Sequence, residues 1–569
     1  MFTDARSVEK DSLLTTDVCI VGGGAAGITL ARELIGSPLR VAVIESGDFE
    51  FDPRTQDLYD GPSIGLPYGR LIGPRLRYFG GTTNHWGGIC RPFDEADFEA
   101  REGIPFTGWP IRKADVDPFY GAAATICRVP SPHWDLSYWT ERDRLGALPF
   151  KGDRIGNRVA QVVPEPSRSF GKNYREELDK AANVAVYLHA NAMRLDTDDL
   201  GRTVTSAGVA TLSGNRFSLR ARLFVLATGA IENARLLLVS KTDRWPAGIG
   251  NHHDLVGRFF LEHPRFVAGV ITPSNPRMRL GFYNVHRVGG ATLRGYLASS
   301  KDFQLAEGLL DVQIRPEPFY GRSVEGAAES PEVASLKSLL RSIRSREKVS
   351  NFGRHVSNVV TDLMTWERFV IPGAPLPVPY PEVLGKLVGS TPRKAEDLIP
   401  ELLGDVATAV YARGRGRIDA ILLRTRFEQA PNPDSRVLLI EERDQLGMPR
   451  MALDWRLTDA DRRNVRRTLE ALGAEVGRAG IGRLKILHGE QDTGWPEDLG
   501  GGQHLMGTTR MSDDPKRGVV DRNLRVHEMS NLFVAGCSVF PTPGGATPTM
   551  MLVALTLRLA RHLKAMMLT

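Results

Sequence analysis

A glycine-rich turn near the N-terminus constrains this chain more than any other stretch. Residues 17–34 read DVCIVGGGAAGITLAREL, and a second apolar run at 40–44 ends on Glu45. In such a strand–turn–helix unit Gly22 allows the tight turn, Gly24 admits a pyrophosphate close to the backbone, and Gly27 lets the helix pack on the strand. We therefore expect a dinucleotide here, with its phosphates at the helix N-terminus and its ribose hydroxyls at Glu45. The turn alone does not distinguish FAD from NAD.

Length and composition narrow the class of protein. The chain has 569 residues, which is too long for one ordinary core, so we expect two domains. A composition of 42% hydrophobic and 25% charged residues is typical of a soluble globular protein. The net charge of +6 is spread along the chain among acidic residues, which argues against a nucleic-acid partner.

Cysteine spacing and hydropathy suggest a cellular location. Cys19, Cys90, Cys127 and Cys537 lie far apart without a C-x-x-C pair, so we expect no disulfide framework, zinc site or iron–sulfur cluster. No stretch reaches the roughly 18 apolar residues that a membrane span needs, and residues 1–16 lack a signal-peptide core. We expect a cytoplasmic protein without a transmembrane segment.

Three further stretches share the character of a flavin or phosphate site. The loop at 77–92 carries four glycines around Thr-Thr-Asn-His-Trp, and glycines admit a flat ring close to the backbone. Residues 184–191 and 220–229 read as strands, the second breaking at Ala-Thr-Gly into a helix from 231. Near the C-terminus, 523–526 and 531–536 read as strands, and a helix from 550 follows the turn at 541–549. A second strand–glycine–helix junction favours FAD over a nicotinamide cofactor.

Between these halves the pattern changes. Residues 266–494 alternate less regularly and include strand-like pieces such as 435–440 and a proline-rich run at 372–381. We interpret them as a second, α+β domain built on an antiparallel sheet and inserted into an α/β Rossmann-like domain at 1–265 and 495–569, to which the loop at 77–92 belongs. Residues 335–346 are predicted to form a basic amphipathic helix that is solvated on the second domain.

Taken in order, these motifs resemble the glucose–methanol–choline (GMC) oxidoreductases, FAD enzymes that oxidise alcohols. The resemblance extends over nearly the whole chain: the glycine unit with Glu45, the 77–92 loop, Ala227-Thr-Gly229, His504-Leu-Met-Gly-Thr-Thr-Arg-Met and Gly536-Cys-Ser538 with Pro541-Thr. Within the family, 77–88 and 428–437 are similar to the bacterial sugar branch related to pyranose oxidase and glucoside 3-dehydrogenase.

The resemblance implies the cofactor and the residues that hold it. We expect FAD to contact three groups of residues: the first turn and strand end (Gly22, Gly24, Ala25, Ala26, Gly27, Glu45, Ser46), the glycine loop (Gly81, Thr82, Thr83, Asn84, His85, Trp86) and the later strand ends (Ala192, Ala227, Thr228, Gly229, Gly536, Cys537, Ser538, Thr547, Pro548, Thr549). His85 matches a position that carries a covalent flavin bond in some relatives. A covalent bond is left open, and a non-covalent contact is favoured.

The resemblance places the catalytic histidine on His504. Alcohol oxidation removes a hydroxyl proton and a carbon-bound hydride; flavin takes only the hydride, and imidazole is suited to accept the proton. The second catalytic position, usually Asn or His, is Thr547, which lacks a titratable group. Gln503, Thr549 or a group from the second domain could compensate for it. For His263 a structural role is favoured over a substrate contact.

We therefore expect FAD-dependent oxidation of a primary or secondary hydroxyl of a sugar, glycoside or amino sugar to an aldehyde or ketone. The electron acceptor would be O2, a quinone or a protein, and a small subunit or a homo-oligomer is left open. Two alternatives share the fold: a lyase that cleaves a cyanohydrin, and an FAD-binding protein with little redox activity, which Thr547 motivates. An NAD-dependent dehydrogenase is a third alternative.

Overall fold

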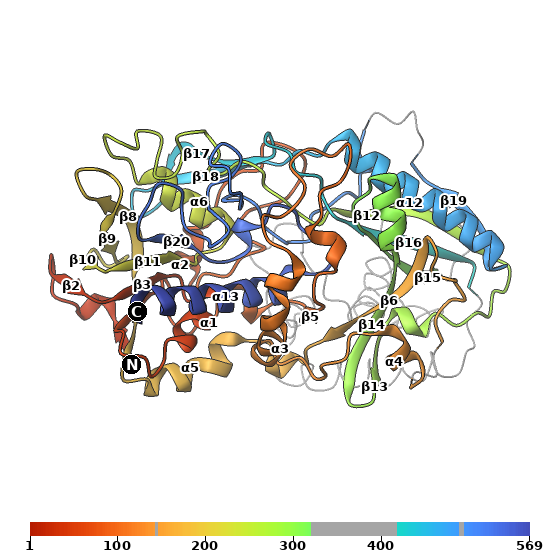
Figure 1. Cartoon of the computed structure of the whole chain (residues 1–569), viewed down its shortest axis with the longest axis horizontal. Coiled ribbons are helices and arrows are strands. Elements are labelled where there is room, and N and C mark those ends of the chain that lie inside the picture. The colour runs from red at the N-terminus through yellow and green to blue at the C-terminus, as the bar shows by residue number, and fades with distance from the viewer. Residues whose placement is uncertain (143–145, 320–417, 489–493, 569) are drawn as a thin grey trace, which may run out of the picture.

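The computed structural model describes residues 1–142, 146–319, 418–488 and 494–568. Figure 1 shows the strands of the glycine-turn region gathered at one end of the molecule, where both chain termini lie, and a second group of strands with a long helix at the other end. The predicted helix at 335–346 and the proline-rich run at 372–381 lie outside the described residues.

The first sheet carries the glycine turn. All six strands are parallel, in the order β1-β7-β4-β3-β11-β20. Its central strands are continuous apolar runs with every residue buried, as expected for a parallel sheet covered on both faces. The strands are β1 (Phe2–Asp4), β3 (Val18–Val21), β4 (Val41–Ile44), β7 (Val184–Leu188), β11 (Leu223–Leu226) and β20 (Leu532–Val534).

The helices around this sheet come from both ends of the chain. The first helix, α1, packs against the last, α13, and α13 also contacts α3, so the two ends of the polypeptide share one core (Figure 1). The bounds are α1 (Ala25–Glu33), α2 (Pro53–Asp57), α3 (Asp117–Ile126), α5 (Phe170–Lys180), α6 (Ala230–Val239) and α13 (Pro548–Leu568).

Two smaller sheets lie beside α6. The first has the order β2-β10-β9-β8 and is antiparallel except that β2 and β10 run parallel. The other is an antiparallel hairpin that contacts α6. The strands are β2 (Leu13–Thr15), β8 (Asn191–Thr197), β9 (Val204–Ala210), β10 (Arg216–Arg220), β17 (Arg436–Arg443) and β18 (Pro449–Asp454).

The large sheet at the other end is antiparallel throughout. Its order is β19-β12-β16-β15-β14-β6-β5, with β13 paired to β14, and the 20-residue helix α12 covers β6, β12, β15 and β19 over a second core. The elements are β5 (Ile89–Cys90), β6 (Ile155–Val162), β12 (Arg265–Pro273), β13 (Val285–Val288), β14 (Ala291–Ser299), β15 (Val312–Phe319), β16 (Ala420–Phe427), β19 (Gly482–Ile486), α4 (Leu136–Thr140), α7 (Lys301–Glu307) and α12 (Asp459–Arg478).

The α/β Rossmann-like fold with an antiparallel second sheet is as expected, whereas the domain boundaries stay a prediction. Strands β5 and β6 come from before residue 265 yet belong to the large sheet. Conversely, Val437, Leu453 and Trp455 come from the second segment yet pack in the core of the first sheet. The predicted strand at 523–526 is absent: Arg525 and Val526 form only isolated bridges, to Phe533 and Val520.

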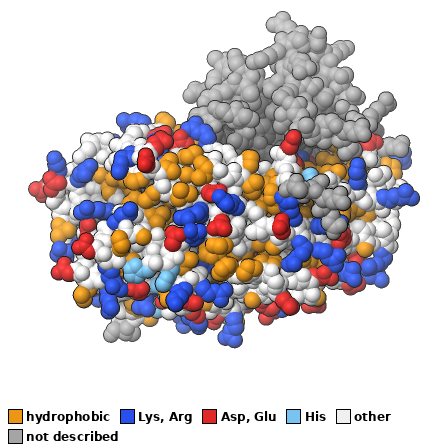
Figure 2. Space-filling model, turned by 90° about the horizontal axis from the view of Figure 1, so that it is seen from above, with side chains coloured by type: hydrophobic (Ala, Val, Ile, Leu, Met, Phe, Trp, Pro, Cys, Tyr) orange, Lys and Arg blue, Asp and Glu red, His pale blue; other side chains and the backbone are white. Residues whose placement is uncertain are grey.

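The surface charges and the cysteines can be compared with the composition of the chain. Basic and acidic side chains are interspersed over the face in Figure 2. The four cysteines are free. Among the described residues, no helix has the length and apolar character that crossing a membrane requires.

Candidate active site

A cavity of about 300 Å³ lies at the carboxyl ends of the parallel strands β3, β4, β11 and β20. Ligands of open α/β sheets bind at this edge. The walls bring together the glycine turn, the glycine loop and the C-terminal segment, so residues from positions 21 to 552 meet around one space. Of the residues predicted to bind the cofactor or to act in catalysis, all but three line the cavity.

The three exceptions support the walls from behind. The Cβ of a side chain at Gly27 would lie 1.8 Å from the Gly22 carbonyl oxygen, so Gly27 sets the closeness of helix and turn. The Asn84 amide donates to the Phe79 carbonyl, and the Ser538 hydroxyl accepts from the Asn233 amide. These two hydrogen bonds fix the conformation of the glycine loop and of the turn that follows β20.

The turn between β3 and α1 presents open backbone to the cavity. Gly22 has φ 108°, a conformation that favours glycine. A Cβ added at Gly24 would meet nothing within 4 Å, and Gly24 caps α1 with no side-chain hydrogen bond, so helix N–H groups remain available to a phosphate. Glu45 accepts hydrogen bonds from the N–H groups of Gly23 (2.8 Å) and Gly47 (2.9 Å), which fix its carboxylate at the wall.

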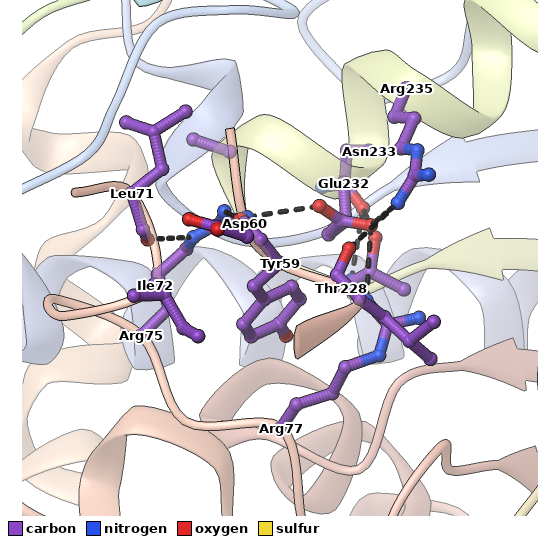
Figure 3. Close-up of polar contacts among 12 residues, drawn as sticks. Tyr59, Asp60, Leu71, Ile72, Arg75, Arg77, Thr228, Glu232, Asn233 and Arg235 are labelled. Atoms are coloured by element: carbon purple, nitrogen blue, oxygen red, sulfur yellow. Dashed lines mark hydrogen bonds and ion pairs between the residues drawn. The ribbon is translucent and has the colours of Figure 1, made fainter. Parts of the chain in front are cut away.

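A buried ion network forms another part of the same wall (Figure 3). Arg75 and Arg77 bond the two oxygens of Glu232 at 3.0 and 3.1 Å, and both guanidinium groups lie over the ring of Tyr59. Burial opposes ionisation of Glu232, but the arginines, Arg235 foremost, overcome it and lower its pKa to about 2. Burial raises the pKa of Tyr59 to about 12. The Nε of Arg77 is buried and has no partner in the protein, so it can donate to a bound ligand.

The network also ties the cavity to the β17–β18 hairpin. Arg235 is 2% exposed and reaches the Asp444 carboxylate at 2.7 Å, while its Nη1 lies 3.3 Å from Glu232. Sequence reasoning missed Tyr59, Arg75, Glu232 and Arg235. The glutamate–arginine pair three residues apart directly after Ala227-Thr-Gly229 was the available signal, because it opens helix α6 at the cavity.

The glycine loop presents two aromatic side chains. The imidazole of His85 bonds the Pro74 carbonyl, and burial lowers its pKa to about 4, so His85 is neutral near pH 7. The indole of Trp86 donates to the Arg168 carbonyl at 2.9 Å. The Thr83 hydroxyl donates to the Gly80 carbonyl at 2.5 Å, which closes the short helical turn at Gly81–Asn84.

His504 lines the cavity, and His263 lies behind it in contact with its imidazole. Nδ1 of His504 is 2.8 Å from Nδ1 of His263, and Nε2 of His263 is 2.6 Å from the Gly544 carbonyl oxygen. A carbonyl only accepts, so His263 carries its proton on Nε2 and its Nδ1 is an acceptor. His504 must then donate from Nδ1, and its unprotonated nitrogen is Nε2. Burial, with a smaller contribution from the charge of Arg426, lowers the pKa of His263 to about 3, so His263 is neutral near pH 7 and this direction holds there.

Glu262 fixes the backbone of both histidines. Its carboxylate accepts from the N–H groups of His263 (2.6 Å), His504 (2.8 Å) and Gly502 (2.9 Å), and also from the Tyr68 hydroxyl. One buried carboxylate therefore joins two segments that are more than 240 residues apart in the chain.

Thr547, at the position where the GMC oxidoreductases that the sequence resembles carry Asn or His, has its hydroxyl proton committed to the protein. It donates to the Ile89 carbonyl at 2.5 Å, so toward a substrate it can only accept. Other donors line the wall around it: Gln503 and Thr549 from the predicted set, and Arg265 and Arg426 from the large sheet, which the sequence reading did not single out.

The chain is similar to a family model and to several known proteins. Residues 431–556 match the family model described as GMC oxidoreductase. The chain is similar to 6'''-hydroxyparomomycin C oxidase of Streptomyces lividus (25% identical, 96% of this chain and 90% of the relative) and to paromamine 6'-oxidase of Streptomyces fradiae (25%, 97% and 92%). C-glycoside 3-oxidase of Arthrobacter globiformis is 35% identical over 21% of this chain and 22% of its own. Formate oxidase of Aspergillus oryzae RIB40, studied for its FAD modification, has the same fold (TM-score 0.53, 17% identity, covering 98% of this chain and 99% of the solved one).

Proposed function

From its membership of the GMC oxidoreductases, FAD-dependent enzymes that act on CH–OH donors, we propose that this chain oxidises a hydroxyl of a sugar, glycoside or amino sugar. The product is the corresponding ketone or aldehyde. The observation that carries the proposal is His504, which lines the cavity that the glycine turn also lines and whose imidazole contacts His263. The names of the relatives, which act on paromamine and on C-glycosides, support the substrate class.

The residues of the cavity fit FAD. The open space at Gly24 and the uncapped N-terminus of α1 suit a pyrophosphate. The orphaned Nε of Arg77 and the carboxylate of Glu45 suit the polar groups of the adenosine half. The remaining predicted residues of this part of the wall are small: Gly22, Ala25, Ala26, Ser46, Ala192, Ala227, Gly229, Gly536 and Cys537. The wall proposed for the ring system consists of Gly81, Thr82, Thr83, His85, Trp86, Pro548 and Thr549.

In this proposal His504 is the base. FAD supplies the two-electron acceptor for the hydride that leaves the carbinol carbon. The hydroxyl proton goes to Nε2 of His504, which His263 keeps unprotonated by accepting from Nδ1. Glu262 holds the imidazole in place through the backbone, and Thr547 can accept a hydrogen bond from a neighbouring substrate hydroxyl. The C–H and O–H bonds break, and the C=O bond forms.

Anaerobic mixing with a panel of sugars, glycosides and amino sugars tests the function. We expect the yellow flavin to bleach, and His504→Ala to slow bleaching on the order of 10²–10⁴-fold while FAD stays bound. The exposed His253→Ala is the matched control and should keep the wild-type rate. A near-normal rate in His504→Ala would remove His504 from this role. Turnover of a cyanohydrin without bleaching would point to the lyase alternative.

Non-covalent FAD is also part of the proposal. His85 lines the cavity beside the other residues of the glycine loop, where its imidazole can contact the ring system without a covalent bond. Acid precipitation of the holoenzyme should release all FAD into the supernatant. Yellow colour that stays with the pellet would show a covalent bond.

The acceptor and the setting complete the proposal. O2, a quinone or a protein is the acceptor. Similarity to oxidases supports O2, and similarity to the fructose dehydrogenase large subunit of Gluconobacter japonicus (20% identical) supports an acceptor other than O2. We place the enzyme in the cytoplasm, alone, with a small subunit or as a homo-oligomer. Reoxidation of the bleached enzyme by air, by a soluble quinone and by cytochrome distinguishes the acceptors.

A further inference from the structure

A second, smaller cavity adjoins the catalytic end of the first. Its volume is about 60 Å³, and Ile89, Arg265, Arg426 and Thr547 line both spaces. Room of this size suits one small polar group in place of a few water molecules, and it is too small for another sugar ring. A substrate whose hydroxyl reaches His504 can therefore extend only a compact substituent into it.

Arginine dominates the wall of this second cavity. Six arginines line it, and the lining residues, all from the described part of the chain, include no aspartate or glutamate. The arginines are Arg91, Arg265, Arg294, Arg315, Arg424 and Arg426. Tyr296, Gln313, Thr425 and Thr547 supply the other polar side chains.

The strand register makes this arrangement costly. Arg265 on β12 is directly opposite Arg426 on β16, and Arg315 on β15 is directly opposite Arg424 on β16. Arg424 and Arg426 are two residues apart, so they share one face of the sheet. Like charges directly opposite each other on a sheet are destabilising.

Among the described residues, two carboxylates form ion pairs with arginines of this wall. Glu317 pairs with Arg424 and, at 3.5 Å, with Arg315. Asp94 pairs with Arg91, at 3.0 Å, and with Arg158. Each carboxylate thus serves two guanidinium groups. The Nη1 of Arg315 is buried and has no hydrogen-bond partner among the described residues, so it can donate to a ligand.

We propose that the substrate is a sugar bearing an anionic group, a carboxylate or a phosphate, which this arginine-lined cavity binds while the reacting hydroxyl faces His504. The inference rests on the proposed function and narrows its substrate class. Guanidinium groups bind carboxylate and phosphate through paired N–H donors, and they disfavour an ammonium group in the same place. Uronic acids and sugar phosphates fit, whereas sugars that place an amine there do not.

A matched set of sugars tests the proposal. D-Glucose, D-glucosamine, D-glucuronate and D-glucose 6-phosphate share one ring and differ in charge. With the holoenzyme at low salt, the Kd from flavin bleaching should be at least tenfold lower for one of the two anions than for glucose, and highest for glucosamine. Raising the ionic strength should weaken anion binding and leave glucose unchanged. The better anion identifies the group as carboxylate or phosphate.

Variants locate the effect in the cavity. Arg294, on β14, lines the cavity, whereas Arg287, on the paired strand β13, is exposed and does not. Arg294→Gln should raise the Kd of the preferred anion five- to tenfold and leave that of glucose unchanged, with Arg294→Lys between. Arg287→Gln removes the same net charge and should change neither Kd.

Two results would overturn the inference. One is bleaching by glucose or glucosamine at a Kd equal to or below that of both anions. The other is equal loss of anion binding in Arg294→Gln and Arg287→Gln. If no sugar bleaches the flavin, the proposed function fails instead. Binding is then measured by the melting temperature of the holoenzyme with each anion at constant ionic strength. If neither anion raises the melting temperature more than glucose does, anion binding in the cavity is also refuted.

Discussion

At the scale of single residues, the site depends on the direction of one chain of hydrogen bonds. The Gly544 carbonyl fixes the proton of His263 on Nε2, and this fixes the proton of His504 on Nδ1. Two neutral histidines placed differently could exchange these roles, and His504 would then present a proton where the proposed mechanism needs a base. In the proposed function His263 is thus a positioning residue, which is a more specific role than the structural one favoured from sequence.

Substituting His263 tests this direction. His263→Leu removes the acceptor, so we expect FAD binding to persist and the rate of flavin bleaching to fall about 10- to 100-fold, the cost typical of losing a group that orients an active imidazole. His263→Gln keeps one acceptor and one donor and should recover most of the rate. The measurement is the pH profile of bleaching in both variants. A role for His263 in packing alone predicts that both lose rate equally with an unchanged profile.

At the scale of elements, the β3–α1 unit uses its glycines for two different purposes. Gly27 has no room for a side chain, because a Cβ added there would clash with the Gly22 carbonyl. Gly24 faces open space, because a Cβ added there would have no described atom within 4 Å. The same motif therefore contains one glycine for packing and one for the ligand.

This difference predicts opposite effects of two alanine substitutions. Gly27→Ala should push α1 off the sheet, and we expect a loss of unfolding free energy of about 1–3 kcal/mol, as for overpacking. Gly24→Ala should leave the stability of the apoprotein nearly unchanged and weaken FAD, since the methyl group enters the space offered to the pyrophosphate. Melting curves without FAD and titration of flavin fluorescence separate the two; a Gly24→Ala protein with normal FAD affinity would contradict the assignment.

The sequence predicted those features whose residues lie close together in the chain, and it missed contacts between distant residues. The strand–glycine–helix units at 17–34 and 220–238 carry their turn chemistry within a few residues, so their form and their place at the sheet edge were predictable. The expectation that His504 lines the cavity with those units came from the family motif. The partner of His504 was not predictable, because His263 is 241 residues away. Nor was the pairing of Arg315 with Arg424, because register across a long insertion leaves no pattern in either strand.

At the scale of the whole molecule, burying the site between two cores sets the response to pH. His263 and His85 have pKa values of about 3 and 4 because burial disfavours their charged forms. Glu428 and Asp461 have pKa values raised to about 7 and 6, also by burial. The histidines destabilise the fold toward acid and the carboxyls destabilise it toward neutral pH, so the two groups oppose each other.

The contribution of His263 can be isolated by substitution. Between its ordinary pKa near 6.5 and about 3, the unfolded chain binds a proton at this residue and the folded chain does not. Stability from a neutral His263 is therefore present above about pH 6.5 and is lost as the pH falls, by roughly 1.4 kcal/mol of unfolding free energy per pH unit. We expect the melting temperature of His263→Gln to fall less steeply than that of the wild type from pH 6.5 to 4.5, while the exposed His253→Gln keeps the wild-type slope. Equal slopes in all three proteins would mean that His263 is protonated in the folded enzyme, and the direction of the hydrogen bond to His504 would then have to be reversed.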